Sequence, residues 1–373
     1  MAPRILIAPD KFKGSLTALA AAEAIARGIK TACPKAKLVS MPIADGGEGT
    51  AEAMGAALGG SWITVRSTDP LGRSIAARYA WLKDEVAVID MSEASGLGRL
   101  SIAERDPLHA TTSGTGQLVA DAIRRGARKI LVGLGGSATN DGGIGMAEAL
   151  GYAFFDLHGR RLQAVPANLA NLARIQAPAA PPRANIIGLC DVQNPLTGKR
   201  GASRTYGPQK GADPHMVQRL DDDLAHLADV VARDLRCDFR AMPGAGAAGG
   251  LGFGLLSFCG ATLRSGFETL AETLQLEKEI AASDFIITGE GRIDAQTLEG
   301  KGPAGVAALA RKHRKPVIAF AGAVADDPRI ATVFDRVLAI TPPGMPLDEA
   351  LREAPRLLEN CAADTATRFL VLL

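Results

Sequence analysis

The sequence predicts an α/β protein with two domains, because strand and helix patterns alternate at both ends of the chain while the middle differs. At each end, short apolar runs are followed by helical spacing, and such alternation is typical of parallel sheets. With 373 residues, the chain is also long for one domain. We therefore predict a two-domain architecture: a Rossmann- or flavodoxin-like parallel-sheet domain formed by both termini, an inserted α+β domain and an interdomain cleft.

The first domain is predicted from βα units at the two ends. RILIA and KLVSMPIA flank a helical pattern at 16–32, which gives a βαβ unit. Near the C-terminus, DFIITG is followed by a helix at about 303–313, the strands PVIAFAGA and RVLAITP, and a helix from about 347. We assign residues 1–65 and 280–373 to this domain.

The inserted domain is predicted at 66–279. In residues 61–91, strand-like stretches alternate with turn signals such as DPLG and LKDE, which favours antiparallel hairpins. Residues 115–151 carry a helix, the strand KILVGLGG and another helix. The stretch 152–185, which contains APAAPP, is the most loop-like part of the sequence.

Charge and composition indicate a small-molecule partner. The 42 basic and 40 acidic residues give a net charge of +2 without a basic block, which argues against nucleic-acid binding. No apolar run approaches the roughly 18 residues of a membrane span, and the first residues lack a signal-peptide pattern. The 5 cysteines are scattered, which argues against a disulfide framework or a zinc site. We expect a cytoplasmic protein that binds neither nucleic acid nor membrane.

Glycines cluster in loops at the expected strand ends. Such loops expose backbone N–H groups and, where a helix follows, add its dipole, so they suit phosphate oxygens. One such loop is equally well explained as a tight turn, whereas several loops that carry ionisable residues indicate a site. The clusters lie at 44–50, 111–116, 133–143, 243–254 and 288–302.

Familiar nucleotide and hydrolase motifs are absent or incomplete. EGKG at 299–302 lacks both the upstream glycine and the following Ser or Thr of a Walker A loop. Gly244, Gly246 and Gly249 spell GxGxxG, but the run RCDFRAM before them is a poor central strand. No G-x-S-x-G elbow is present, and the 5 histidines are not spaced as metal ligands.

The remaining chemistry rests on loop carboxylates and lysines, which phosphoryl transfer uses. That reaction needs a divalent ion held by acids, cations on the phosphates and a carboxylate near the attacking hydroxyl. Each single residue also has a plainer explanation as a helix cap, an Asx turn or a surface lysine. The acids are Asp10, Asp45, Asp141, Asp191, Glu290 and Asp294, the cations are Lys11, Lys13, Lys210 and Lys301, and the hydroxyls are Ser113, Thr115 and Ser137.

Seven sequence blocks follow one another along the chain: APDKFKGSL, ADGGEGT, TTSGTGQL, GLGGSATNDGGIGMAEALG, CDVQNPLTG with GPQKGA, PGAGAAGGLGFG and TGEGRIDAQTLEGKGP. Together they resemble the signature blocks of bacterial type I glycerate kinases. The resemblance implies Mg²⁺-dependent transfer of the ATP γ-phosphate to D-glycerate, with 2-phosphoglycerate as product and 3-phosphoglycerate as the alternative. It also implies an α/β domain built from both termini. The departures, at Lys11 and in RTYGPQKGA, involve none of the acids assigned below.

The mixed charges of 284–305 are interpreted as a site for this substrate. Arg292 can clamp a carboxylate with its planar guanidinium. Glu290 and Asp294 can orient a hydroxyl or hold Mg²⁺. We predict catalytic roles for Asp45, Asp191, Lys13 and Lys301; substrate contacts for Arg292, Glu290, Asp294, Asp10, Ser113 and Thr115; ATP contacts for Gly135, Gly136, Ser137, Asp141, Gly246 and Gly249; and Mg²⁺ ligation by Asp191 and Glu290.

Two other functional classes stay open at this point. An NAD-dependent dehydrogenase would rest on Gly244, Gly246 and Gly249. A non-catalytic sugar-acid sensor would keep the carboxylate clamp without paired acids for Mg²⁺, and the number of loop carboxylates argues against it. We expect a monomer or a homodimer.

Overall fold

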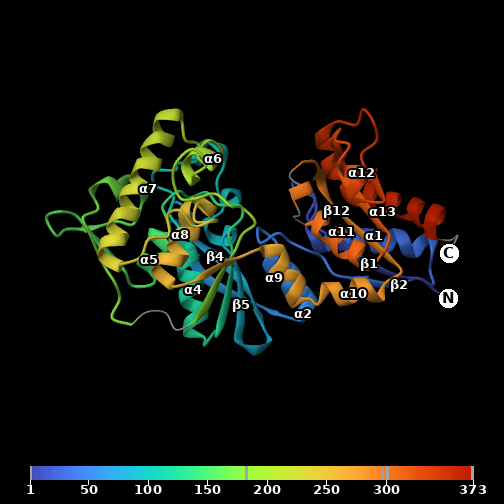
Figure 1. Cartoon of the computed structure of the whole chain (residues 1–373), viewed down its shortest axis with the longest axis horizontal. Helices are drawn as coiled ribbons and strands as arrows, with labels where there is room; N and C mark the ends of the chain where they lie inside the picture. Colours follow the sequence, from blue (N-terminus) through green and yellow to red (C-terminus); the bar gives the residue numbers. More distant parts are fainter. Residues whose placement is uncertain (1, 181–183, 296, 300–301, 371–373) are drawn as a thin grey trace. The chain divides into compact units, whose positions relative to one another are not determined.

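The fold is described from a computed structural model, which covers residues 2–180, 184–295, 297–299 and 302–370 (Figure 1). The chain divides into two compact units. The first contains residues 1–45, 52–57 and 267–373, and the second contains residues 46–51 and 58–266. Both units combine helices with sheets that contain parallel strands, which confirms the predicted α/β class.

The unit boundaries differ from the predicted positions at residues 65 and 280. Strand β3 (Ser61–Thr68) pairs along its length with β4 (Ser74–Leu82), so the residues just before 65 belong to the second unit. Helix α10 (Leu276–Ala282) contacts β1 (Arg4–Pro9) and α11 (Pro303–Lys312), so it belongs to the first unit, although it begins before residue 280.

A five-stranded parallel sheet forms the centre of the first unit. Its strand order is β14-β13-β12-β1-β2, and every neighbouring pair is parallel. Strand β1 pairs on one side with β2 and on the other with β12, so both ends of the chain contribute to one sheet, as the alternation of patterns predicts. The strands are β1 (Arg4–Pro9), β2 (Lys37–Ser40), β12 (Phe285–Ile293), β13 (Val317–Val324) and β14 (Arg336–Ala339).

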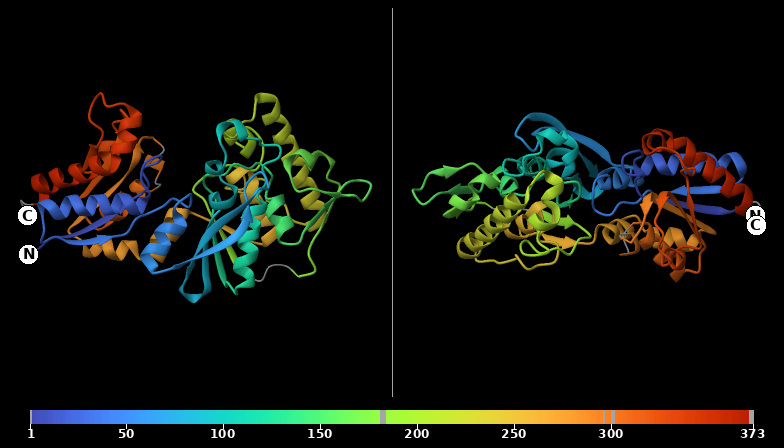
Figure 2. Two further views of the ribbon diagram at one scale, coloured as in Figure 1. Left: turned by 180° about the vertical axis from the view of Figure 1, so that it is seen from behind. Right: turned by 90° about the horizontal axis from the view of Figure 1, so that it is seen from above.

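Helices cover both faces of this sheet (Figure 2). On one face, α1 and α13 pack together over Ile5, Ile7 and Phe320. Gly28 permits this close helix contact, because a Cβ there would overlap the Glu359 backbone oxygen. Helices α10 and α11 cover the other face. The helices are α1 (Ala18–Ala32), α9 (Gly266–Thr273), α10, α11 (Pro303–Lys312), α12 (Ile330–Val333) and α13 (Leu347–Thr365).

The second unit contains a six-stranded mixed sheet in the order β11-β10-β6-β5-β4-β3. Strands β3, β4 and β5 run antiparallel, as the hairpin pattern at 61–91 predicts. Strands β5, β6, β10 and β11 run parallel. The remaining strands of this sheet are β5 (Val86–Asp90), β6 (Lys129–Gly133), β10 (Asn185–Leu189) and β11 (Thr262–Arg264).

Helices α3 to α8 accompany this sheet. Helix α2 begins in the second unit, but most of it belongs to the first. The helices are α2 (Thr50–Leu58), α3 (Ser92–Ser95), α4 (Ser113–Arg124), α5 (Ile144–Ala149), α6 (Ala202–Tyr206), α7 (Pro214–Leu235) and α8 (Ala247–Cys259).

The segment predicted as the most loop-like, 152–185, contains a small antiparallel sheet. Its order is β8-β7-β9, formed by Ala153–Phe155, Arg161–Leu162 and Arg174–Gln176. Phe154 from this sheet packs edge-on against Phe258 of α8, with ring centroids 6.2 Å apart. Strands of two or three residues are too short for a periodic pattern to show.

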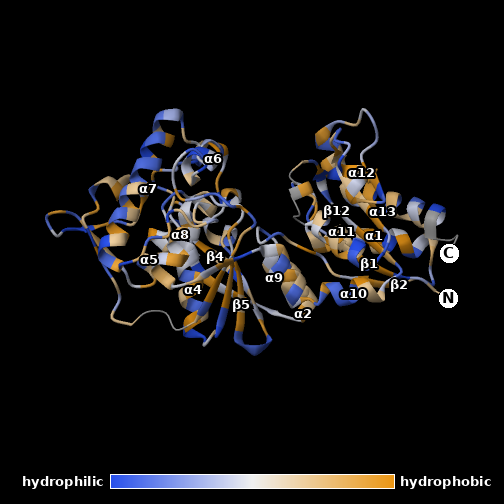
Figure 3. Cartoon of the chain, in the orientation of Figure 1, coloured by the Kyte–Doolittle hydropathy of each residue, from blue (hydrophilic) through white to orange (hydrophobic). Residues whose placement is uncertain are grey.

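Apolar residues concentrate in the strands and on the helix faces that meet them (Figure 3). Among the described residues, no helix is both long enough and apolar enough to span a membrane.

Candidate active site

The strands of the first unit end at one edge of their sheet, and acids follow there. Asp10 comes directly after β1, and its backbone N–H donates to β12 at 2.8 Å. Beyond β2, the Ile43 N–H donates to the end of β1 at 2.9 Å, and this segment leads to Asp45. Glu290 lies near the carboxyl end of β12. Because parallel strands present their carboxyl ends at the same edge, these three acids gather in one region.

The Glu290 carboxyl group is largely enclosed and only partly hydrogen-bonded. It bonds to the Thr297 hydroxyl, while its Oε1 atom is buried without a hydrogen-bond partner among the described residues. Burial raises its pKa to about 7, against the opposing effect of Thr297. The charges of Asp10, Asp294 and Asp45 raise the pKa as well. Such a carboxyl group can accept or release a proton near neutral pH.

The loop after β1 brings the Lys13 backbone against β12. A Cβ on Gly291 would lie 2.9 Å from the Lys13 nitrogen, so glycine permits this approach. Gly14 has φ 83, and backbone hydrogen bonds between Phe12 and Leu16 close the loop. The Lys13 side chain is exposed. A cation in this loop suits an anion bound at the carboxylate edge.

Arg292 and Asp294 extend the same bend. Arg292 Nε lies 3.2 Å from Asp294 Oδ2, and the Arg292 side chain is 68% exposed. An ion pair this exposed is weak, so the guanidinium can also bind a carboxylate ligand. The Asp294 N–H donates to the Thr297 hydroxyl at 3.1 Å, which shapes the bend. Lys301, predicted to be catalytic, lies outside the described residues.

The parallel part of the second sheet also ends in acids. Asp90 ends β5, and Asp191 follows β10. Asp191 Oδ1 accepts the Gly266 N–H at 3.1 Å, which connects the segments that follow β10 and β11. Asp191 therefore lies at the sheet edge where open α/β sheets bind ligands.

Two predicted glycine loops of this unit pack against each other through their backbones. The Leu134 N–H donates to Gly46 O at 2.9 Å, and a Cβ on Gly135 would lie 2.5 Å from Gly47 Cα. Asp90 holds the same region by accepting two backbone N–H groups at the start of α2, at 2.9 and 3.1 Å. The loop packing therefore explains Gly135 without a nucleotide.

The next two predicted ATP contacts also serve the protein's own structure. Gly136 has φ 73, and its carbonyl accepts the Leu97 N–H at 2.8 Å. Ser137 is only 7% exposed and forms an isolated β-bridge with Gly96. Both residues thus connect the loop after β6 to the segment after α3.

Asp141 is fully buried and is saturated with hydrogen bonds. It accepts the Thr112 N–H at 2.8 Å and hydroxyl at 2.7 Å, and two backbone N–H groups at the start of α5 at 3.0 and 3.2 Å. The Lys210 ammonium, also buried, donates to Thr139 O at 2.6 Å. Burial raises the pKa of Asp141 and lowers that of Lys210 to about 7. We therefore assign Asp141 a structural role in place of the predicted ATP contact.

Other predicted contacts are internal as well. A Cβ on Gly246 or Gly249 would overlap a backbone carbonyl oxygen of a neighbouring loop, and Gly249 also has φ 67. Thr115 is fully buried and donates to the Ser95 hydroxyl at 2.8 Å, so it is withdrawn as a substrate contact. Ser113 begins α4 and is half-buried. The GxGxxG glycines thus serve backbone packing, which removes the basis of the dehydrogenase alternative.

The acids of the first unit fit a metal that arrives with its phosphate ligands. No cluster of three or more His, Cys, Asp or Glu side chains that could hold a metal occurs within the residues described. Mg²⁺ is usually bound by one or two carboxylates together with substrate phosphates and water. The hard oxygen atoms of Glu290 and its acidic neighbours suit such a partial site. The other predicted ligand, Asp191, belongs to the second unit.

Sequence reasoning missed two residues that position this chemistry. Thr297 lies in the stretch 284–305, which the sequence singles out by its mixed charges. The signal that could have identified it is a hydroxyl residue shortly after Glu290 and Asp294. Asp90 ends the apolar run VAVID, which is the same strand-end signal that identified the other acids.

The glycerate kinase family model matches residues 5–370. The chain belongs to the glycerate kinase family. This finding confirms the resemblance of the seven sequence blocks, and it identifies the chain as a member of a kinase family that uses ATP.

Curated relatives and a solved structure agree with this membership. The chain is 45% identical over 357 residues to the glycerate 2-kinase of Escherichia coli K12, with 94% of each chain covered. It is 42% identical over 369 residues to the glycerate kinase of Bacillus subtilis 168, with 97% of each covered. A crystal structure of a Salmonella typhimurium LT2 protein assigned as glycerate kinase 2 matches with TM-score 0.86 and 43% identity, covering 100% of this chain and 99% of that one.

Proposed function

We propose that this protein transfers the γ-phosphoryl group of ATP to the C2 hydroxyl of D-glycerate, giving 2-phosphoglycerate and ADP. Membership of the glycerate kinase family supports the reaction class. The observation that carries the chemistry is Glu290, a buried carboxyl group with an unpartnered oxygen and a pKa of about 7.

We infer that Glu290 orients the attacking hydroxyl and receives its proton. The substrate oxygen forms a bond to the γ-phosphorus, the bond from that phosphorus to the leaving ADP oxygen breaks, and the hydroxyl proton passes to the carboxylate. Metal ligation by Glu290 is the other predicted role. Its raised pKa favours the proton-accepting role, because a carboxylate whose pKa lies near neutral pH is a stronger base than an ordinary one.

The neighbouring residues divide the substrate between them. Arg292 offers an exposed guanidinium to the glycerate carboxylate, in the bidentate fashion that Arg favours. Lys13 lies on the loop packed against β12 and suits the phosphoryl oxygens. Asp10 and Asp45 would hold Mg²⁺ beside the phosphates. When bound, that ion neutralises charge that develops on the phosphate oxygens.

Asp191 remains a predicted participant at the sheet edge of the second unit. Its Oδ1 bond to the Gly266 N–H fixes the carboxylate. Asp191→Asn should lower turnover by orders of magnitude without unfolding the protein, if the residue acts on substrate or metal.

Phosphorus NMR tests the proposed reaction directly. Purified protein is incubated with Mg²⁺-ATP and D-glycerate, with L-glycerate and acceptor-free samples as controls. A proton-coupled phosphomonoester doublet is expected, because the carbon next to the C2 oxygen carries one hydrogen. A triplet would place the phosphate on C3. Intact ATP with every acceptor would overturn the proposal and favour the sugar-acid sensor.

A further inference from the structure

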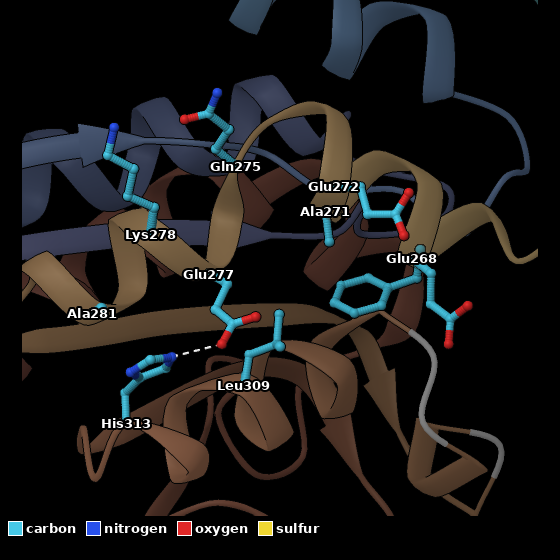
Figure 4. A pocket seen from close by; sticks show the side chains of 10 residues that line it. Glu268, Ala271, Glu272, Gln275, Glu277, Lys278, Ala281, Leu309 and His313 are labelled. Atoms are coloured by element: carbon cyan, nitrogen blue, oxygen red, sulfur yellow. Dashed lines mark hydrogen bonds and ion pairs between the residues drawn. The ribbon is translucent and has the colours of Figure 1, made fainter.

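A cavity of about 570 Å³ lies among three helices of the first unit, α9, α10 and α11 (Figure 4). Four apolar side chains line it, Phe267, Ala271, Ala281 and Leu309, together with Gln275 and the ionisable side chains Glu268, Glu272, Glu277, Lys278 and His313. The volume lies in the range of pockets that take small organic ligands, which combine apolar walls with polar groups that fix the ligand's orientation. No part of the chemistry described above uses this cavity.

An unusual backbone turn separates α9 from α10 beside this cavity. Gln275, between the two helices, has φ 54 and ψ 37, a left-handed conformation that a non-glycine residue adopts at a cost. Ala271 of α9 and Ala281 of α10 line the space with small side chains. A short side chain on each helix leaves room that a larger residue would fill.

One end of the cavity is fixed by an ion network. His313 Nε2 lies 2.8 Å from Glu277 Oε1, and the two side chains point toward each other in Figure 4. Lys312 Nζ lies 2.6 Å from the same oxygen. Both cations thus contact Glu277 at this end of the cavity.

The other end of the cavity lies close to the carboxylate edge. A Cβ on Gly305 would overlap the Phe267 ring, so the ring lies on the backbone of α11. A Cβ on Gly302 would lie 3.0 Å from Asp10 Oδ2. Gly302 and Gly305 are three residues apart, and three residues of helix span only about 4.5 Å. The cavity therefore begins about one turn of α11 from the acids of the candidate active site.

We propose that this cavity holds the adenine and ribose of the ATP used in the proposed reaction, on which this inference rests. A nucleoside there would direct its phosphates toward the N-terminus of α11, whose dipole and free N–H groups favour anions. The Gln275 amide can donate to and accept from an adenine edge, and the carboxylates of α9 can accept from ribose hydroxyls. The glycines first assigned to ATP in the second unit are instead explained by backbone packing.

Two neighbouring alanines of α10 give a matched test. Both are exposed, but Ala281 lines the cavity and Ala282 does not. Ala281→Phe places a ring in the space for the nucleoside, and Ala282→Phe adds the same ring elsewhere on the helix. We expect Ala281→Phe to weaken ADP binding, measured by calorimetry without glycerate, about tenfold or more, while Ala282→Phe leaves it unchanged. Binding of Mg²⁺-tripolyphosphate, which lacks a nucleoside, should be unchanged in both variants.

The outcomes separate this inference from the proposed reaction. If wild-type protein binds ADP and Ala281→Phe binds it equally well, the cavity is not the nucleoside site and the kinase proposal stands. If wild-type protein binds no ADP, both proposals fail. If Ala281→Phe lost tripolyphosphate binding as well, the substitution would have damaged the unit generally. The test then passes to Ala271→Phe, which fills the same cavity from α9. A folded Ala271→Phe variant that binds ADP normally would overturn the inference. Photolabelling with 8-azido-ADP should modify peptides from α9 to α11; labels confined to the second unit would contradict it.

Discussion

Glu290 and Asp141 both carry enclosed carboxyl groups in glycine-rich segments, although Asp141 is fully buried and Glu290 half-buried, and their hydrogen bonding is opposite. Asp141 accepts four hydrogen bonds from the protein. Glu290 bonds to Thr297, and its Oε1 has no partner within the described residues. A saturated carboxylate holds loops together, whereas an unsaturated one is available for a ligand or a proton. The number of hydrogen-bond donors around each acid therefore distinguishes the structural carboxylate from the one available for chemistry.

The largest expected effect is on turnover by Glu290→Gln. The amide keeps the size of the side chain but cannot accept the hydroxyl proton, so kcat should fall about 10²- to 10⁴-fold. The free energy of unfolding should change little, since Oε1 has no partner to lose. Steady-state kinetics and a urea unfolding curve measure the two effects. Glu353→Gln, which alters an exposed pair with Arg356, serves as control. Near-normal turnover of Glu290→Gln would contradict the proton-accepting role of Glu290.

Asp141→Asn should mainly lower the free energy of unfolding, in contrast to Glu290→Gln, which mainly lowers turnover. The NH₂ of the asparagine amide would face N–H groups that now donate to Asp141. A buried clash between donors of this kind lowers the free energy of unfolding by about 3 kcal/mol. Asp156→Asn is the matched control, because Asp156 also accepts several bonds, but only from His158 and Arg160 of its own hairpin, whose tip is exposed. If denaturant unfolding shows equal small losses in both variants, Asp141 does not hold its loops.

Lys210→Met should change the pH dependence of stability. Folded Lys210 loses its proton at a pKa of about 7 and the unfolded side chain at 10.5. Between these values the unfolded state binds more protons, so the free energy of unfolding contributed by this group rises with pH. The wild-type curve should therefore rise relative to that of the variant from about pH 7 to 10. Parallel curves across this window would mean that Lys210 keeps its charge when folded.

The smallest expected effect is a shift in the pH profile by Thr297→Val. The Thr297 hydroxyl lowers the pKa of Glu290, so its removal should raise that pKa further. Since the ionised carboxylate accepts the proton, kcat/KM of the wild type should rise with pH through about 7, and the midpoint should move upward in the variant by up to about one unit. Thr332→Val, at an exposed hydroxyl, should leave it unchanged. A downward shift would contradict the role of Thr297.

Much of the fold could be predicted from the sequence, because long periodic segments report their own structure. The βα units at both ends and the hairpins at 61–91 form as expected. The small sheet in 152–185 could not be found, since its strands are too short for a period. The unit boundaries were displaced because strand pairing, which sequence does not show, decides where β3 belongs.

The candidate site was only partly predictable for a related reason. Position in a glycine-rich or turn segment singled out the candidate acids, but it could not count their hydrogen bonds. Thr115 looked like a ligand contact, yet its hydroxyl bonds to Ser95 inside the unit. Gly246 and Gly249 resembled a phosphate loop, whereas close backbone approach requires both. Burial and partners arise from tertiary packing, and they decide which residues stay available for substrate.

The central position of β1 has a consequence for synthesis on the ribosome. Its partner β12 ends only at residue 293, so one edge of β1 has no native partner until most of the chain has emerged. At 5–20 residues per second, that delay is about 15–60 s. The strands of the second sheet are complete by residue 264. Nascent chains therefore carry an open strand edge, a known template for misassembly, while the inserted unit can already form.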